Sequence, residues 1–397
     1  MKHPAIPVLA ALAAAVAVAA PAHAQGVKIG VLNDQSGVYA DYGGKYSVEA
    51  AKMAIEDFGG SVLGKPIELI SADHQNKPDL GSSIARQWYD TDGVDMITEL
   101  TTSSVALAVH ELSKAKGKID IVVGAATSRI TGDACHSLGF HWAYDTRALA
   151  VGTGGALTKA GGDSWFFLTA DYAFGYQLEE DTAKIVTASG GKVLGAVKHP
   201  LNATDFASFL LQAQSSKAKV VGLANAGGDT INSIKQAAEF GIAAGGQKLA
   251  GLLTTLAEVH GLGLQVGQGL VITEGYYWDN DDKSREFGER FQKRTGRMPN
   301  MIQAGTYSAT LSYLKAVKAA NTKDAPAVAA KMKELPVDDF FGQGGKVLSN
   351  GRMVHDMYLF EVKKPSESKK PFDYYKKLAT IPGEQAFFTV ADSGCKM

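Results

Sequence analysis

The chain has 397 residues, 45% of them hydrophobic, and its 40 lysine and arginine residues almost balance its 41 acidic residues, giving a formal net charge of −1. This length predicts two domains, each with a sizeable core. The balanced charge argues against nucleic acid as a partner, and the lack of a polybasic run argues against an anionic membrane surface.

The first 24 residues have the pattern of a secretory signal peptide. Lys2 and His3 precede an apolar run at 8–20, and the segment PAHA at 21–24 resembles the small-residue cleavage site of exported proteins. The run is shorter than the ~20 residues that span a bilayer. We therefore expect residues 1–24 to be removed after export from the cytoplasm; a buried apolar helix is the alternative.

Apolar runs and amphipathic segments alternate from residue 27 to residue 123. Runs typical of strands lie at 27–32, 66–71, 94–98 and 119–123, and segments with a helical period lie at 44–58, 78–89 and 103–115. Pro78 suits a first helical turn, because the N–H that proline lacks has no partner there. Strands that alternate with helices predict βαβ crossovers and a parallel sheet.

The same alternation starts again after Gly162. Strands are expected at 165–169, 192–197, 220–224, 249–253 and 270–273, and helices at 177–188, 205–214 and 230–240. Thr204 and Asp229 have the residue types that cap the last two of these helices. Helices at 283–294, 301–319 and 326–334 precede a hairpin-like tail with turns at 342–346 and 350–351 and a strand at 354–362.

The fold class expected from this order is α/β, with two doubly wound parallel-sheet lobes of similar size. Ligands of such sheets bind at the carboxyl ends of the strands. Two lobes whose strand ends face each other therefore predict a binding cleft between them.

A search for reaction chemistry finds no complete motif. His110-Glu111 begins like the zinc motif H-E-x-x-H, but its fifth position is Lys114, and neither a G-x-S-x-G elbow nor a Walker loop is present. The acids at 279, 281 and 282 lack the glycine of a calcium loop and precede an expected helix, whose dipole suits them. We therefore expect no enzyme, no cofactor and no metal; an exported enzyme with an undetected site is the alternative.

The chain has two cysteines, Cys135 and Cys395. An even number of cysteines in an exported protein predicts a disulfide. Such a bond would tie the C-terminal tail to a loop far upstream; two unpaired thiols are the alternative.

Several segments share their order and spacing with a known family. They are VKIGVLNDQSGVYADYGG from residue 27, LTTSSVALAV at 100–109, IVVGAATSRITGDAC at 121–135, FHWAYDT at 140–146, DYAFGYQ at 171–177, NAGGD at 225–229 and EGYYW at 274–278. Over nearly the whole mature chain, the sequence resembles the type I periplasmic substrate-binding proteins of ABC transporters, specifically the leucine/isoleucine/valine-binding group. The resemblance implies two lobes joined by a hinge that the chain crosses several times.

We expect the N-terminal lobe to comprise residues 25–146 and 275–345. The C-terminal lobe would comprise residues 147–274 and 346–397, including the tail. The two lobes would meet at the segments 140–146 and 274–278, where the family crosses between lobes.

The resemblance implies a ligand site formed by loops of both lobes. In the family, the turn that starts a helix and the Ala-Thr loop hold the carboxylate of the ligand, which gives this role to Thr102, Ala125 and Thr127, with Ser103 nearby. Hydroxyls and free N–H groups at a helix start also suit an anion on physical grounds. Ordinary N-capping without a ligand is the alternative.

Aromatic residues of the same loops would contact the body of the ligand. Tyr42 matches a residue that covers the ligand side chain, Phe174 matches an aromatic of the second lobe, and Asn225 or Ala226 falls at a further such position. Plain packing is the alternative for these side chains. Trp278 lies in a crossing, where it either lines the cleft or packs the hinge.

One position departs from the family pattern. Amino-acid binders of the family pair the ligand ammonium with an acid of the second lobe, whereas the closest position here is Thr254 or Thr255, with Glu258 a turn further on. A buried ammonium without a carboxylate is costly. We therefore expect a small organic acid, either an aromatic carboxylate or a 2-oxo acid. Arg147 either supplies positive charge to it or lies at the surface.

The expected function is that of an exported, monomeric solute-binding protein. It would close its hinge on the small carboxylate ligand and deliver it to a membrane ABC permease. A branched-chain amino acid or an amide is the alternative ligand, and a ligand-sensing module is an alternative class of protein.

Overall fold

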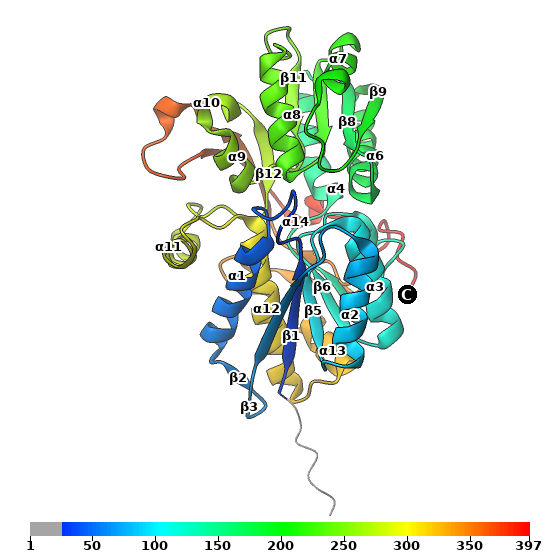
Figure 1. Ribbon diagram of the computed structural model, residues 1–397, viewed down its shortest axis with the longest axis vertical. Helices are drawn as coiled ribbons and strands as arrows, with labels where there is room; N and C mark the ends of the chain where they lie inside the picture. Colours follow the sequence, from blue (N-terminus) through cyan, green and yellow to red (C-terminus); the bar gives the residue numbers. More distant parts are fainter. Residues whose placement is uncertain (1–25) are drawn as a thin grey trace, which may run out of the picture.

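The computed structural model describes residues 26–397 and shows two lobes, one above the other in Figure 1. The expected signal peptide, residues 1–24, lies outside the described residues. Within residues 26–397, no helix is long and apolar enough to cross a membrane. Each lobe contains a parallel sheet with helices on its faces, so the expected α/β class with two doubly wound lobes is confirmed.

The lower lobe in Figure 1, the N-terminal lobe, is built on parallel strands in the order β4-β1-β5-β6-β7. The strands are β1 (Lys28–Asn33), β4 (Glu68–Asp73), β5 (Met96–Glu99), β6 (Ile119–Val122) and β7 (Gly139–His141). The surrounding helices are α1 (Gly44–Phe58), α2 (Pro78–Asp90), α3 (Ser103–Lys116), α12 (Met301–Ala320) and α13 (Ala325–Glu334). Every residue of β5 and β6 is buried, because helices cover both faces of the sheet.

The C-terminal lobe contains a second parallel sheet, in the order β11-β10-β8-β9. The strands are β8 (Ser164–Ala170), β9 (Lys192–His199), β10 (Val220–Ala224) and β11 (Lys248–Gly251), and the helices beside them are α6 (Ala173–Ala188), α7 (Ala207–Ser215) and α8 (Gly227–Glu239). The central strands β8 and β10 are buried along their whole length, whereas most of the edge strand β9 is exposed.

Shorter elements complete the chain. An antiparallel sheet, in the order β12-β15-β16, is formed by β12 (Val271–Glu274), β15 (Met357–Val362) and β16 (Tyr375–Ile381). The remaining helices are α4 (Thr146–Leu149), the π-helix η2 (Ala150–Gly154), α5 (Gly155–Lys159), α9 (Leu256–Leu262), α10 (Leu264–Gly267), α11 (Asp282–Thr295), α14 (Gly383–Ala386), and the 3-10 helices η1 (Ser128–Thr131) and η3 (Pro365–Glu367). Two small hairpins pair β2 (Ser61–Val62) with β3 (Lys65–Pro66) and β13 (Lys346–Val347) with β14 (Met353–Val354).

The hairpin β13–β14 lies beside the N-terminal lobe. His141 at the end of β7 forms a parallel bridge with Arg352, directly before β14. The buried Arg352 side chain also donates to the backbone oxygens of Trp142 and Tyr144. The division of the chain into lobes, including the expected start of the second part of the C-terminal lobe at residue 346, stays a prediction.

The strand order of each sheet indicates at which edge a ligand is expected to bind. In the N-terminal lobe the strand order reverses between β1 and β5, and in the C-terminal lobe it reverses between β8 and β10. A crevice forms outside the carboxyl ends of the strands at such a reversal. The loops after Asn33, Glu99, Ala170 and Ala224 are therefore expected to form the site.

Most expected elements are present, with differences at their ends. The start of α2 at Pro78 is confirmed. The predicted caps Thr204 and Asp229 are wrong: α7 begins after Phe206, and α8 begins after Ala226, so Asp229 lies inside its first turn. The first residue of α8 is Gly227, whose φ of +59° favours glycine.

Candidate functional site

A narrow pocket lies where the strand ends of the two sheets face each other. It is lined by Tyr39, Tyr42, Thr101, Thr102, Ser103, Gly124, Ala125, Ala126, Tyr144, Tyr172, Phe174, Ala226 and Leu253. The cavity between these side chains has a volume of only about 10 Å³. Aromatic side chains therefore fill almost the whole pocket.

The N-terminal lobe presents hydrogen-bond donors at the start of α3. Thr102 precedes this helix with a φ of 78°, and no side chain caps the helix. The first N–H groups of α3 are therefore without helical partners. Ser103 Oγ accepts the Thr127 N–H at 3.2 Å, which leaves the Ser103 hydroxyl proton free to donate. These donors and the positive end of the helix dipole suit a carboxylate.

Aromatic side chains of both lobes face each other across the pocket. Tyr39 of the N-terminal lobe and Tyr172 of the C-terminal lobe form a hydroxyl–hydroxyl hydrogen bond of 2.6 Å. The Tyr42 and Tyr144 hydroxyls are also hydrogen-bonded to each other. The Phe174 ring packs beside Tyr172, with 5.9 Å between centroids. The site therefore combines aromatic faces with hydroxyls that can donate or accept.

Further hydrogen bonds hold the lobes together around the pocket. The Gly228 N–H donates to the Val38 carbonyl oxygen at 3.1 Å, directly between backbones. The buried carboxylate of Asp181 on α6 accepts the hydroxyls of Ser128 at 2.9 Å and Thr146 at 2.6 Å. The two lobes are therefore closed on each other.

The pocket has no cationic side chain among its described lining residues. Burial raises the pKa of Tyr39, Tyr42, Tyr144 and Tyr172, so these hydroxyls stay neutral at physiological pH. A carboxylate would therefore be held by hydroxyl and backbone N–H donors without a salt bridge.

Glu99 lies directly behind the pocket wall, at the end of β5. The Thr101 N–H donates to Glu99 Oε2 at 2.7 Å, and Ser47 Oγ donates to Oε1 at 3.2 Å. Burial raises the pKa of Glu99 to about 7, although hydrogen bonds from Thr101, Asn33 and Ser47 act in the opposite direction.

The structure brings five of the expected ligand residues into the pocket: Tyr42, Thr102, Ser103, Ala125 and Phe174. Ala226, the alternative to Asn225, also lines it. Thr127 lies one step behind, where its N–H orients Ser103 and its own hydroxyl has no hydrogen-bond partner.

Arg147 and Trp278 lie away from the pocket. The Arg147 guanidinium covers the ring of Phe388 in the C-terminal tail, 4.7 Å from its centroid. The Trp278 ring is buried, and its Nε1 donates to the Phe372 carbonyl at 3.0 Å. The Arg147 side chain therefore points to the C-terminal tail, and that of Trp278 points to the loop before β16.

Asn225 and Thr254 are also placed behind the pocket surface. The Asn225 side chain hydrogen-bonds to His199 and Thr230 within the C-terminal lobe. Thr254 is buried without a partner for its hydroxyl, and its neighbour Leu253 reaches the pocket instead. Thr254 therefore does not take the place of the acid that amino-acid binders use.

The sequence interpretation missed Tyr39, Tyr144, Tyr172 and Leu253. Each lies within a few residues of an expected site residue or inside a segment that carried the family resemblance. The density of tyrosines in these loops was the available signal. Which tyrosine of a loop faces the pocket depends on the loop backbone.

Glu258 is the acid of the second lobe closest to the expected position. It accepts the Thr255 N–H at 2.7 Å and forms a capping box at the start of α9. It borders, with Tyr42, a groove of about 530 Å³ beside the pocket. Burial raises the pKa of Glu258, against hydrogen bonds from Thr255 that lower it.

The predicted disulfide between Cys135 and Cys395 is confirmed, across a sequence separation of 260 residues. Figure 1 shows the C-terminus beside the N-terminal lobe. The tail is therefore fixed to the loop before β7.

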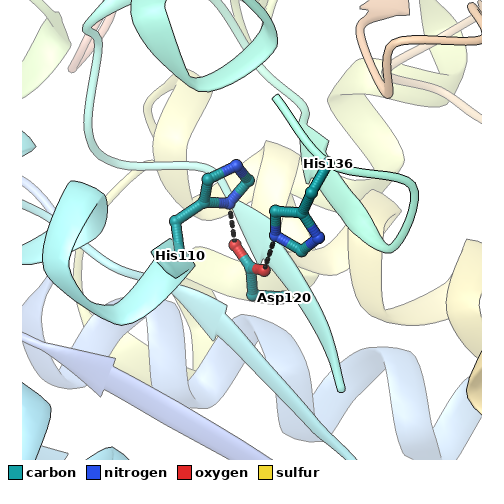
Figure 2. A group of neighbouring side chains, drawn as sticks. All are labelled: His110, Asp120 and His136. Atoms are coloured by element: carbon teal, nitrogen blue, oxygen red, sulfur yellow. Dashed lines mark hydrogen bonds and ion pairs between the residues drawn. The ribbon is translucent and has the colours of Figure 1, made fainter. Parts of the chain in front are cut away.

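A buried cluster of His110, Asp120 and His136 has residue types that also bind metals (Figure 2). His110 Nδ1 lies 2.7 Å from Asp120 Oδ2, and His136 Nε2 lies 3.1 Å from Oδ1. These are hydrogen-bond distances, shorter than the about 3.3 Å between ligands of a tetrahedral zinc with bonds of about 2.0 Å. Burial acts to raise the pKa of Asp120, but the two histidines outweigh it and lower the pKa to about 2. The cluster therefore links α3, β6 and the loop before β7 by hydrogen bonds.

A closed two-lobed α/β fold with a small pocket between facing strand ends defines a type I solute-binding protein. Comparisons with known proteins agree with this class. Residues 26–370 match the periplasmic binding protein family. A solved periplasmic binding protein from Burkholderia mallei is 53% identical, with 94% of this chain and 99% of that chain covered and a TM-score of 0.92.

Two more distant proteins also match over most of their length. An ABC-transporter solute-binding protein from Rhodopseudomonas palustris, solved in complex with 3,4-dihydroxybenzoic acid, is 25% identical, with 90% of this chain and 97% of that chain covered and a TM-score of 0.81. The Leu/Ile/Val-binding protein homolog 6 of Brucella melitensis is 25% identical over 384 residues, with 93% of this chain and 95% of that protein covered. The chain belongs to the periplasmic binding protein family, and the resemblance found in the sequence is confirmed.

Proposed function

We propose that this protein captures a small organic acid, either an aromatic carboxylate or a 2-oxo acid, and delivers it to the permease of an ABC transporter. The observation that carries the proposal is the inter-lobe pocket, in which the uncapped start of α3 lies opposite the aromatic residues Tyr172 and Phe174. The α3 donors would hold the carboxylate, and the rings would cover the body of the ligand. The relative that is solved with 3,4-dihydroxybenzoic acid supports this ligand class.

Transport would follow from hinge closure, without a bond being broken. Ligand contacts to both lobes favour the closed form, because an open form offers only the contacts of one lobe. The mature protein would begin near Gln25 after cleavage of the signal peptide and act as a monomer in the periplasm.

A branched-chain amino acid or amide is the second candidate ligand. Glu258 is buried beside Tyr42 and would accept an ammonium if the ligand reached the adjoining groove. The similarity to a Leu/Ile/Val-binding homolog supports this alternative.

A thermal-unfolding screen of the mature protein distinguishes the two candidates. Benzoate, 3,4-dihydroxybenzoate, phenylpyruvate, leucine and leucinamide would each be tested. A ligand at 100 times its Kd adds about 2.7 kcal/mol of stability. We expect stabilisation by the aromatic acids or phenylpyruvate. Stabilisation by leucine or leucinamide alone would overturn the organic-acid proposal, and chemical conversion of a ligand, followed by mass spectrometry, would identify an enzyme instead.

A further inference from the structure

Glu99 carries a carboxyl that is buried away from water, and its hydrogen-bond partners are all neutral. It is fully buried, and its oxygens accept from the backbone and hydroxyl of Thr101, from Ser47 and from Asn33. A Cβ on Gly43 would lie 2.0 Å from Oε1, and one on Gly124 would lie 2.9 Å from Oε2. Backbone therefore packs directly against the carboxyl and leaves no room for water on these sides.

Thr101 and Gly124 connect this carboxyl to the pocket. Both residues touch Glu99, and both line the pocket. A ligand bound at the start of α3 is therefore separated from Glu99 by a single layer of protein atoms.

The titratable groups around Glu99 supply no positive charge. Burial lowers the pKa of His74 to about 4 and raises that of Tyr144, so both are neutral near pH 7. Asp34 follows Asn33, a hydrogen-bond partner of Glu99, and is an acid. Glu258 of the other lobe is also an acid, and both Glu99 and Glu258 act to raise the pKa of Tyr144. Within residues 26–397, no lysine or arginine lines the pocket or hydrogen-bonds to Glu99.

We propose that capture of a carboxylate in the pocket is coupled to the uptake of a proton by Glu99, and that Thr101 connects the two events. This inference rests on the proposed function. While Glu99 is ionised, the Thr101 hydroxyl donates to it. Once Glu99 takes a proton from solvent, its O–H donates to Thr101 Oγ1, and the Thr101 hydroxyl proton is free to donate to the ligand. Protonation also removes a negative charge that repels the ligand carboxylate.

The pH dependence follows from the position of Glu99. Burial raises its pKa to about 7, against opposing hydrogen bonds, and a bound carboxylate raises this pKa further. Between the two pKa values the free protein is mostly ionised and the complex is mostly protonated. Binding of each ligand is then accompanied by the uptake of up to one proton from solvent. The affinity for the ligand therefore falls up to about tenfold for each pH unit above 7.

Calorimetric titration measures this proton uptake directly. Benzoate and phenylpyruvate would be titrated into the mature protein between pH 6.5 and 8.5, in buffers of different ionisation enthalpy. Carboxylates with an ordinary pKa near 4 stay ionised throughout this range. We expect an uptake of about 0.5 to 0.8 proton per ligand near pH 7.5 for the unmodified protein.

Two variants test whether Glu99 is the group that takes up the proton. Glu99→Gln should bind without proton uptake and with a Kd that no longer depends on pH, since its amide donates to Thr101 as the protonated acid does. Glu274→Gln removes another buried acid whose pKa is raised, on β12 and outside the pocket, and should keep the uptake.

The outcomes separate this inference from the proposed function. Binding of either acid by the unmodified protein without proton uptake would overturn the inference and leave the proposed function intact. Uptake that persists in Glu99→Gln would also overturn it. Failure of both acids to bind would remove the proposed function, and this inference with it.

Discussion

At the residue scale, the orientation of Ser103 is fixed by its neighbour. Its oxygen accepts the Thr127 N–H, so its own proton has a limited range of directions. Ser103 also begins α3 and lines the pocket. A hydroxyl held in this way loses little freedom when it binds a ligand, which makes its hydrogen bond effective.

Ser103→Ala should weaken binding of an organic acid about 10-fold to 100-fold. The variant removes one hydrogen bond to a charged group, a contribution of about 1.5–3 kcal/mol. Calorimetric titration with the best ligand of the thermal screen measures the change. Ser104→Ala, at the next position of α3 and outside the pocket, is the matched control and should bind as the unmodified protein does. Equal affinities for both variants would remove Ser103 from the site.

At the element scale, two helix starts set how the lobes meet. The turn into α3 has positive φ values at Glu99, Leu100 and Thr102, of 78°, 53° and 78°, which non-glycine residues rarely adopt. Backbone hydrogen bonds from Val123 and Gly124 to the Glu99 carbonyl hold this turn in place. Such strain at the mouth of a pocket is typical of a functional turn.

The second helix start, at α8, allows the lobes to close. Gly227 has a φ of +59°, and a Cβ there would lie 2.4 Å from the Val38 carbonyl oxygen of the opposite lobe. Gly227→Ala should therefore weaken ligand affinity at least about tenfold, since closure and binding are coupled. Ligand titration and small-angle scattering with ligand present measure affinity and closure.

A control variant separates the clash from backbone strain. Gly263 has a similar φ of +73°, but no atom lies within 4 Å of the position of its Cβ. Gly263→Ala should cost stability, as Gly227→Ala does, without loss of affinity. If both variants bind as tightly as the unmodified protein, the contact between Gly227 and Val38 does not limit closure.

At the scale of the whole molecule, the C-terminal tail is attached to the N-terminal lobe by packing and by the disulfide. Phe387 lies beside the buried Arg352, with 4.4 Å between guanidinium and ring centroid, and Phe388 lies under Arg147. The disulfide from Cys395 to Cys135 then fixes the end of the tail. Arg147, expected as a site residue, thus contributes to this attachment.

Replacement of both cysteines, Cys135→Ser with Cys395→Ser, should lower the free energy of unfolding by roughly 2–5 kcal/mol. The bond closes a loop of 260 residues and so restricts the unfolded chain. Urea unfolding with and without reductant measures the effect. Reductant should destabilise the unmodified protein and leave the double variant unchanged; an equal response of both would mean that the bond does not contribute.

Much of the fold was predictable because its signals are local. Helical periods placed α1, α3 and α12 within one residue of their observed ends, since side chains three or four positions apart share a helix face. The strand β16 was missed, because its exposed, lysine-containing sequence lacks an apolar run and depends on pairing with β15.

The sequence by itself determined the alternation of strands and helices, the loops that carry the site, and the pair of cysteines that become bonded. Only the tertiary structure decided which side chains of those loops meet: Tyr39, Tyr144 and Tyr172 face the pocket, whereas Arg147, Asn225 and Trp278 do not. The physical reason is distance along the chain. Periodicity and capping act over a few residues, whereas the direction of a loop side chain also depends on residues far along the chain that pack against it, as Tyr172 of one lobe does against Tyr39 of the other.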